Sequence, residues 1–204
     1  MIPAAQPARR PLVLASSSRY RKTLLARLGL RFVAASPEVD ETPRPGERGT
    51  TLATRLALAK AAALALDHPE ALVIGSDQIA SLDERLIGKP GSRDAAIAQL
   101  AAAAGRDVLF ETAVCVLDAA SGRIESRVVS TTVGFRALER SEIEAYVELE
   151  PAFDCAGAFK AEALGIALCR RIDSPDPTAL IGLPLIALCE LLAVFGESPL
   201  SPGQ

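Results

Sequence analysis

A serine-rich turn followed by basic residues is the first segment of this sequence that could bind an anion. It runs from Ser16 to Lys22 and follows Leu12 to Ala15, an aliphatic run typical of a buried strand. Where a strand leads into a helix, backbone N–H groups, serine hydroxyls and a guanidinium such as that of Arg21 can converge on phosphate oxygens. The same residues could instead cap the helix and leave their charges in solvent. Both interpretations stay open for this segment alone.

An aspartate after the next buried strand is the candidate catalytic base. Asp77 follows the aliphatic run Ala71 to Gly75, and a side chain at the carboxyl end of a strand commonly projects into a cleft. The chain has a single histidine, His68. A carboxylate would therefore have to take the proton from water or hold the metal ion that activates the water. The alternative is a turn aspartate that caps the strand end.

An acidic cluster and two lysines could hold a metal ion and a phosphate group. The cluster Glu38–Glu41 lies in a proline-containing loop and could give Mg²⁺ oxygen ligands beside a phosphate. Lys60 lies among alanines late in an expected helix, an apolar setting that indicates a directed cation, and Lys89 precedes Pro90. Each of these groups could also be an ordinary solvated charge.

Two later segments are rich in small residues, Asp154–Glu162 and Ile181–Pro184. Small residues allow a ligand to approach the backbone closely. Packing of a tight turn explains the same composition equally well.

Hydrophobic patterns predict strands that alternate with helices, and therefore an α/β fold. The expected strands are 11–15, 31–35, 71–75, 79–82, 85–87, 108–117, 124–135 and 165–172. The expected helices are 19–28, 51–66, 92–104, 141–150 and 183–195. The hairpins at 79–87 and 108–135 indicate mixed strand directions, and 36–49 is an expected exposed loop. One domain, 11–196, lies between expected flexible tails at 1–10 and 197–204.

Composition restricts the classes of partner. Half of the 204 residues are hydrophobic, so the chain can bury a sizeable core. The net charge of −3 provides no general attraction to nucleic acid or to an anionic membrane. No run of about 18 apolar residues occurs, and the short apolar run after Arg10 is no signal peptide, so neither a membrane span nor a nucleic-acid partner is expected. The hydrophobic last helix is interpreted as core, which leaves a homodimer open.

The cysteines indicate the compartment. They are widely separated and show no CxxC spacing; they are Cys115, Cys155, Cys169 and Cys189. With one histidine in the chain, a zinc site is not expected. Their surroundings, rich in alanine and leucine, indicate buried free thiols in a reducing compartment, and thus a cytoplasmic protein.

Taken in order, these segments resemble the Maf family of nucleotide pyrophosphatases over nearly all of residues 11–196. The matching segments are Leu14-Ala15-Ser16-x-Ser18-x-x-Arg21 with Leu24-Leu25, then Glu38-Val39-Asp40-Glu41, Lys60-Ala61, Gly75-Ser76-Asp77, Gly88-Lys89-Pro90, Ala156-Gly157-Ala158-Phe159 and Gly182-Leu183-Pro184. The resemblance implies a Maf/ITPase-like fold, elongated and two-lobed, with a mixed twisted sheet flanked by helices and a central cleft.

The resemblance also implies a reaction. A nucleoside triphosphate is hydrolysed at its α–β phosphoanhydride to the monophosphate and pyrophosphate, with Mg²⁺ or Mn²⁺. Asp77 would be the general base and Glu41 a metal ligand. The groups around the triphosphate would be Ser16, Arg21, Lys60 and Lys89. Such cations suit this role, because the charge of a triphosphate must be neutralised before a nucleophile can approach phosphorus.

Within the family, the segments around Ser76-Asp77-Gln78 and Cys155–Glu162 look like the branch that hydrolyses 7-methyl-GTP. The branch that acts on dTTP and UTP typically has Asp-Thr and a Gln instead. By this resemblance, base specificity is set by Tyr20, Gln78 and Glu162. N7 methylation gives guanine a positive charge, which both a carboxylate and an aromatic ring favour.

Two positions depart from the pattern of that branch. Arg19 stands where proline is usual, and Tyr20 stands where tryptophan is usual, which leaves a smaller aromatic face. A dTTP and UTP pyrophosphatase and a non-catalytic, nucleotide-binding regulator of septum formation are the alternative functions. Asp77 favours an enzyme, because a binding protein needs no base beside acidic metal ligands.

Overall fold

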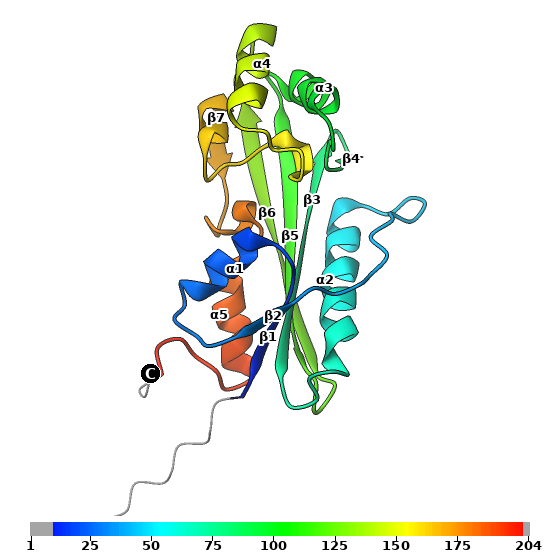
Figure 1. Cartoon of the computed structure of the whole chain (residues 1–204), viewed down its shortest axis with the longest axis vertical. Coiled ribbons are helices and arrows are strands. Elements are labelled where there is room, and N and C mark those ends of the chain that lie inside the picture. Colours follow the sequence, from blue (N-terminus) through cyan, green and yellow to red (C-terminus); the bar gives the residue numbers. More distant parts are fainter. Residues whose placement is uncertain (1–9, 202–204) are drawn as a thin grey trace, which may run out of the picture.

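A single mixed sheet runs the length of an elongated molecule in the computed structural model, which describes residues 10–201 (Figure 1). Its strands within the described residues are β1 (Leu12–Ala15), β2 (Val33–Ala35), β3 (Leu72–Leu82), β4 (Arg85–Ile87), β5 (Asp107–Asp118), β6 (Ile124–Phe135) and β7 (Cys169–Asp173). They lie in the order β2-β1-β3-β5-β6-β7, and β4 pairs with β3. β1 is parallel to β2 and β3, whereas the other pairs are antiparallel. The predicted α/β class with mixed strand directions is confirmed.

The predicted end of the strand at Gly75 is wrong. β3 is continuous from Leu72 to Leu82 and pairs with β5 on both sides of Asp77, which lies opposite Ala113. The polar stretch Ser76-Asp77-Gln78 does not end the strand, because ladder hydrogen bonds use the backbone while side chains alternate between the two faces. Asp77 therefore projects from the middle of a strand rather than from its carboxyl end.

The helices cover the sheet in separate groups. They are α1 (Arg19–Ala26), α2 (Gly49–Ala65), α3 (Arg93–Ala103), α4 (Arg140–Leu149) and α5 (Leu185–Val194), with short 3₁₀ turns η1 (Ala156–Ala158), η2 (Leu164–Leu168) and η3 (Ala179–Ile181). α2 lies on one face of the lower half of the sheet, α1 and α5 lie on the other, and α3 and α4 lie at the far end (Figure 1). The predicted strand at 165–172 begins only at Cys169, because η2 precedes it. No helix of the described residues is both long and apolar enough to cross a bilayer.

Alternating side chains build the lobe that contains β1. Leu14 and Ile74 face α1 and α5, whereas Val13 and Val73 face the alanine-rich side of α2. α5 buries its leucines in the first of these layers, which confirms the interpretation of the last helix as core.

The other lobe packs around aromatic side chains. Phe135 and Phe159 meet edge to face with ring centroids 5.3 Å apart, and Phe110 lies beside Phe159. α3 and α4 contribute Leu100 and Ile143 to the same cluster. The long strands β3, β5 and β6 join the two lobes (Figure 1), so the predicted two-lobed shape is confirmed.

Arg10 and Glu197, predicted from the sequence to lie in the tails, are packed against the body. The Arg10 amide donates to the Glu197 carboxylate at 3.1 Å, and its guanidinium pairs with Asp118. The remaining tail residues 1–9 and 202–204 lie outside the described residues.

All four cysteines are free, but the prediction that they are buried holds for one of them. Cys115 is fully buried, and burial raises the pKa of its thiol to about 12. The partly exposed ones are Cys155, Cys169 and Cys189.

Gly75 lets α2 approach β3 closely. A Cβ added there would lie 2.1 Å from the Ala57 carbonyl oxygen and 3.0 Å from the Ala61 nitrogen. We expect Gly75→Ala to lower the free energy of unfolding in urea by about 1–3 kcal/mol, because the helix must move away. Gly88→Ala is the control, since nothing lies within 4 Å of its added Cβ. Equal effects of the two substitutions would contradict this constraint.

Candidate active site

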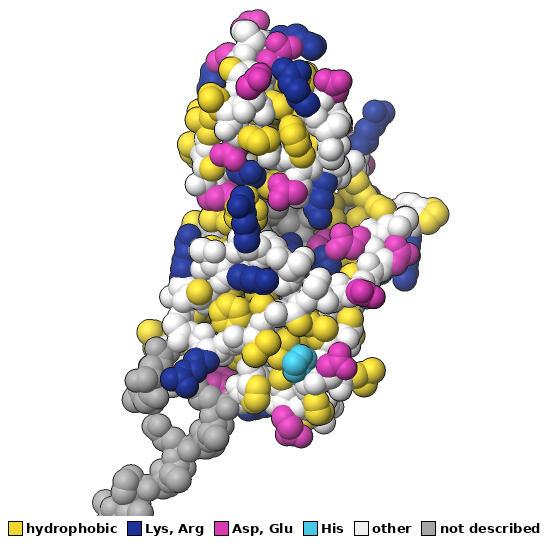
Figure 2. Space-filling view, in the orientation of Figure 1, with side chains coloured by type: hydrophobic (Ala, Val, Ile, Leu, Met, Phe, Trp, Pro, Cys, Tyr) yellow, Lys and Arg dark blue, Asp and Glu magenta, His cyan; other side chains and the backbone are white. Residues whose placement is uncertain are grey.

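A cavity of about 810 Å³ opens between the two lobes. It is the hollow in Figure 2 with basic and acidic side chains around it. All of the site residues predicted from the sequence line it, namely Ser16, Tyr20, Arg21, Glu41, Lys60, Asp77, Gln78, Lys89 and Glu162. The structure thus brings together groups from α1, α2, β3 and four loops.

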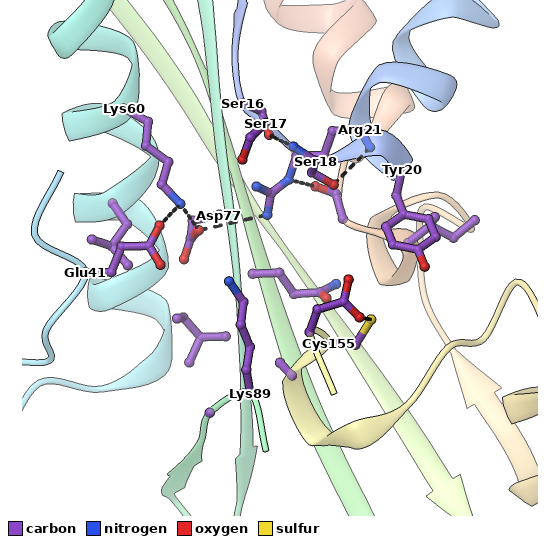
Figure 3. Close-up of a pocket in the computed structure, with 18 of the residues that line it drawn as sticks. Ser16, Ser17, Ser18, Tyr20, Arg21, Glu41, Lys60, Asp77, Lys89 and Cys155 are labelled. Atoms are coloured by element: carbon purple, nitrogen blue, oxygen red, sulfur yellow. Dashed lines mark hydrogen bonds and ion pairs between the residues drawn. The ribbon is translucent and has the colours of Figure 1, made fainter. Parts of the chain in front are cut away.

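Lys60 bridges two carboxylates at the centre of the cavity. Its Nζ lies 2.6 Å from Asp77 Oδ1 and 2.6 Å from Glu41 Oε1 (Figure 3). Lys60 is 6% exposed and Asp77 is 7% exposed, so this pair is desolvated. A buried ammonium requires such partners, since an unpaired charge at this depth would be strongly unfavourable.

Arg21 approaches Asp77 from the opposite side (Figure 3). Its Nη2 is 3.9 Å from Asp77 Oδ1, and its Nε donates to the Gly182 carbonyl at 2.8 Å. Burial lowers the pKa of Arg21, and the charges of Asp77 and Glu41 oppose that shift. Asp77 therefore lies between one cation from α1 and one from α2.

Glu41 is the member of the acidic cluster that reaches the cavity, and about half of its side chain is exposed. Burial favours its neutral form, but the hydrogen bond and charge of Lys60, with the charges of Lys89 and Arg21, hold its pKa below the ordinary value. Asp40, in contrast, accepts a hydrogen bond from the amide of Thr42 at 2.9 Å, so it belongs to the turn. Glu38 and Asp40 do not line the cavity.

Arg55 ties the loop that carries Glu41 to α2. Its Nε and Nη2 donate to the two carboxylate oxygens of Glu47 at 2.7 and 2.8 Å, and Nη2 also donates to the Thr42 carbonyl at 3.1 Å. Hydrogen bonds from Arg55 and from the amide of Arg44 lower the pKa of Glu47 to about 2. A bidentate pair of this kind fixes both position and orientation, and so holds Glu41 over Lys60.

The serines at the start of α1 serve as helix caps and also line the cavity. Ser18 Oγ accepts from the Arg21 amide at 3.4 Å, and Ser16 Oγ accepts from the Ser18 amide at 3.1 Å. Both alternatives left open by the sequence are thus compatible with the structure, because a capped turn still faces the cavity.

Tyr20 and Cys155 lie on the side of Asp77 away from Lys60 and Glu41 (Figure 3). The Arg19 guanidinium lies 4.7 Å from the centroid of the Tyr20 ring and donates to its hydroxyl at 2.7 Å. One face of the ring is therefore covered, as expected of a cation–π pair. Burial, together with the carboxylate of Asp154, raises the pKa of Cys155 to about 12, so this thiol is a poor nucleophile.

Gln78 supports the floor of the cavity. Its Nε2 lies within hydrogen-bonding distance of the carbonyls of Ala179 and Leu180, at 2.9 and 3.0 Å, and of Thr112 Oγ1 at 3.0 Å. Thr112 donates to the same Ala179 carbonyl at 2.9 Å, and Ser76 donates to the Gly182 carbonyl at 3.0 Å. The sequence interpretation missed Thr112, whose only signal is a hydroxyl within an aliphatic strand.

Asp176 is a second residue that the sequence interpretation missed. It is 2% exposed and accepts from the amide and hydroxyl of Thr178 at 3.0 and 2.7 Å, and from the Ile186 amide at 2.7 Å. It therefore fixes η3 and the start of α5, between which Gly182 lies. An aspartate followed two residues later by threonine is a turn signal that could have identified it.

The described residues offer a metal ion only a partial set of ligands. They contain no group of three or more Asp, Glu, His or Cys side chains placed to hold one. Glu41 and Asp77 nevertheless reach a common cation, the Lys60 ammonium. Mg²⁺ is usually held by one or two carboxylates together with substrate phosphates, so this pair fits a metal ion that arrives with a nucleotide.

Comparison with known proteins identifies the family. A model described as Maf-like protein matches residues 11–195. The chain belongs to the Maf-like protein family. Relatives named 7-methyl-GTP pyrophosphatase are 53% identical in Thiobacillus denitrificans, over 93% of this chain and 94% of that protein, and 51% identical in Bordetella pertussis, over 98% of each. One from Polaromonas sp. is 52% identical, over 95% of this chain and 88% of that protein.

A more distant likeness is found among solved structures. The Staphylococcus aureus Ham1 protein aligns with a TM-score of 0.42 and 20% identity, over 62% of this chain and 71% of that chain. At this TM-score the likeness does not bear on the function of the Maf-like protein.

Proposed function

We propose that this Maf-like protein hydrolyses 7-methyl-GTP to 7-methyl-GMP and pyrophosphate. The observation that carries the proposal is the position of Asp77, a buried carboxylate in a large cavity with Lys60 and Arg21 on its two sides. The relatives named 7-methyl-GTP pyrophosphatase, about half identical over nearly the whole chain, support the choice of nucleotide.

The triphosphate binds where the cations converge. Arg21 and Lys60 come from the lobe of β1, and Lys89, in the loop after β4, faces them across the cavity. Among the described residues Lys89 makes no salt bridge, so its ammonium is available to a phosphate. Together with the turn at Ser16, these groups offset charge on the phosphates and position the α-phosphorus near Asp77.

Asp77 acts as the general base. A bound phosphate accepts hydrogen bonds from Lys60 and so competes with Asp77 for the ammonium, which frees Oδ1 to accept a proton from water. The water oxygen forms a bond to the α-phosphorus, the bond from this phosphorus to the bridging oxygen breaks, and pyrophosphate leaves. The low solvent exposure of Asp77 strengthens its electrostatic contacts in this step.

A divalent ion, Mg²⁺ or Mn²⁺, belongs to the proposal. Glu41 and Asp77 would hold it, together with oxygens of the nucleotide. When bound, such an ion supplies charge neutralisation and polarises the phosphoryl oxygens. Arg55 and Glu47 keep Glu41 in place for this role.

Base specificity is assigned to the opposite end of the cavity. Glu162 lies near Cys155, since its charge acts on that thiol, and its carboxylate suits the positive charge of N7-methylguanine. Tyr20 offers the ring face that Arg19 leaves open. Gln78 acts through η3, because its amide nitrogen is already bonded to the carbonyls there.

Two features bear on the alternatives. The buried base beside two cations argues for an enzyme rather than a binding protein that regulates septum formation. A carboxylate at position 162, where the dTTP and UTP branch would have a glutamine, argues for a cationic base.

The free cysteines of the described residues support a cytoplasmic location.

Replacing the base tests the function. We expect Asp77→Asn to retain the fold but to lower pyrophosphate release from 7-methyl-GTP by about 10²–10⁴-fold, because the amide cannot accept the proton. Release is measured in a coupled pyrophosphate assay, with Asp67→Asn, at an exposed position, as the control. Turnover like that of the unmodified protein in Asp77→Asn would remove Asp77 from the reaction.

The carboxylate of Glu162 is tested by an isosteric change. We expect Glu162→Gln to lower the preference for 7-methyl-GTP over GTP by about tenfold, which corresponds to about 1.4 kcal/mol, because the lost charge no longer favours the cationic base. The measurement is the ratio of kcat/KM for the two nucleotides. Glu148→Gln, exposed on α4, should leave that ratio unchanged. An unchanged ratio in Glu162→Gln would separate this residue from base selection.

A further inference from the structure

A second cavity, of about 270 Å³, adjoins the base-binding end of the first. It is lined by Ala161, Glu162, Ile172, Ser174, Pro177, Leu180 and Ile181. Three of these residues, Glu162, Leu180 and Ile181, also line the large cavity. The two cavities therefore meet at one carboxylate and two aliphatic side chains.

The second cavity is suited to an apolar group. Two polar side chains line it, those of Glu162 and Ser174. The Ser174 hydroxyl donates to the Asp176 carbonyl at 2.8 Å, accepts from the Asp176 amide at 3.3 Å and lies 2.7 Å from Thr131 Oγ1, so its hydrogen-bonding capacity is already used. The remaining walls are aliphatic side chains and a proline, from which an apolar occupant displaces water favourably.

The position of Glu162 indicates which part of a nucleotide points there. In the proposed function, the cations Arg21, Lys60 and Lys89 bind the phosphates, on the side of the large cavity that contains Asp77. In an N7-alkylated guanine the positive charge belongs to the five-membered ring that carries N7. A carboxylate that faces this charge lies beside the N7 substituent, so the substituent is directed toward the boundary with the second cavity, where Glu162 lies.

The volume exceeds what a methyl group fills. A cavity of about 150 Å³ lined by aliphatic and aromatic side chains is large enough to bind benzene. A space of about 270 Å³ can thus take an alkyl or benzyl group and still leave room for the side chains to adjust.

We propose that the second cavity is a subsite for the N7 substituent, so that the substrates are N7-alkylated guanosine triphosphates as a class and not the methyl compound alone. The proposal rests on the proposed function, since it takes the large cavity to bind the base of a guanine nucleotide.

The test compares substituents of increasing size. We measure kcat/KM for 7-methyl-, 7-ethyl- and 7-benzyl-GTP, and the calorimetric affinity for the three corresponding monophosphates. Ala161→Leu fills the second cavity without lining the first, and Ile172→Ala enlarges it. Ala167→Leu, at an exposed position that lines neither cavity, is the matched control. Two opposite changes of volume keep the test valid if one variant does not fold.

In the unmodified protein we expect 7-benzyl-GTP to be hydrolysed within about tenfold of 7-methyl-GTP. Ala161→Leu should lower kcat/KM for the benzyl compound by about tenfold more than for the methyl compound, because the larger substituent needs more of the filled space. Ile172→Ala should favour the benzyl compound, and Ala167→Leu should change neither.

Two results would overturn the subsite. One is hydrolysis of 7-methyl-GTP with rejection of both larger substituents; the other is an equal loss for all three substrates in Ala161→Leu. Absence of hydrolysis from 7-methyl-GTP would instead refute the proposed function. In that case the calorimetric affinities for the monophosphates test the subsite. Tighter binding of 7-benzyl-GMP than of GMP, lost in Ala161→Leu, supports the subsite, and equal binding of the two refutes it.

Discussion

The Lys60 ammonium between the carboxylates of Asp77 and Glu41 is the interaction on which the site depends. Two carboxylates brought this close would repel each other, and a buried ammonium without a partner would be strongly unfavourable. With both contacts at 2.6 Å, the ammonium offsets the charges of both carboxylates at once. The cluster thus brings together the proposed base, the proposed metal ligand and a proposed phosphate-binding cation before any substrate arrives. A bound triphosphate then only has to compete for the ammonium.

One strand, β3, positions this cluster within the fold. Asp77 projects from the middle of β3, a strand long enough to enter both lobes, so its carboxylate lies in the cavity between them. Gly75 lets α2 come close enough for Lys60 to reach it. On the other face of β3, Gln78 and Ser76 hold η3 and Gly182, to which Arg21 also bonds. The alternation of side chains along this one strand thus places the proposed base on one face and the supporting hydrogen bonds on the other.

Much of this arrangement can be predicted from the sequence, and the errors have physical causes. Every site residue predicted from the ordered motifs lines one cavity. The motifs are informative because binding a phosphate or a metal ion requires a particular residue type at each position. The predicted end of the strand before Asp77 is wrong because three consecutive polar residues look like a turn. Pairing with β5, a tertiary effect, overrides this local preference and continues the strand. The supporting roles of Gln78, Thr112 and Asp176 depend on carbonyls more than sixty residues away or on a buried turn, which no local pattern records. The roles of the site residues themselves stay predictions.

If this cavity cleaves a triphosphate with a cationic guanine base, the rate of pyrophosphate release must depend on the base. The measurement is release from 7-methyl-GTP, GTP, dTTP and UTP, each with Mg²⁺ and with Mn²⁺. We expect the highest kcat/KM for 7-methyl-GTP, since a neutral base gains nothing from the carboxylate of Glu162. Preference for dTTP and UTP would contradict the assignment of the base-binding end, and release from none of the four would contradict the catalytic account and favour a nucleotide-binding protein.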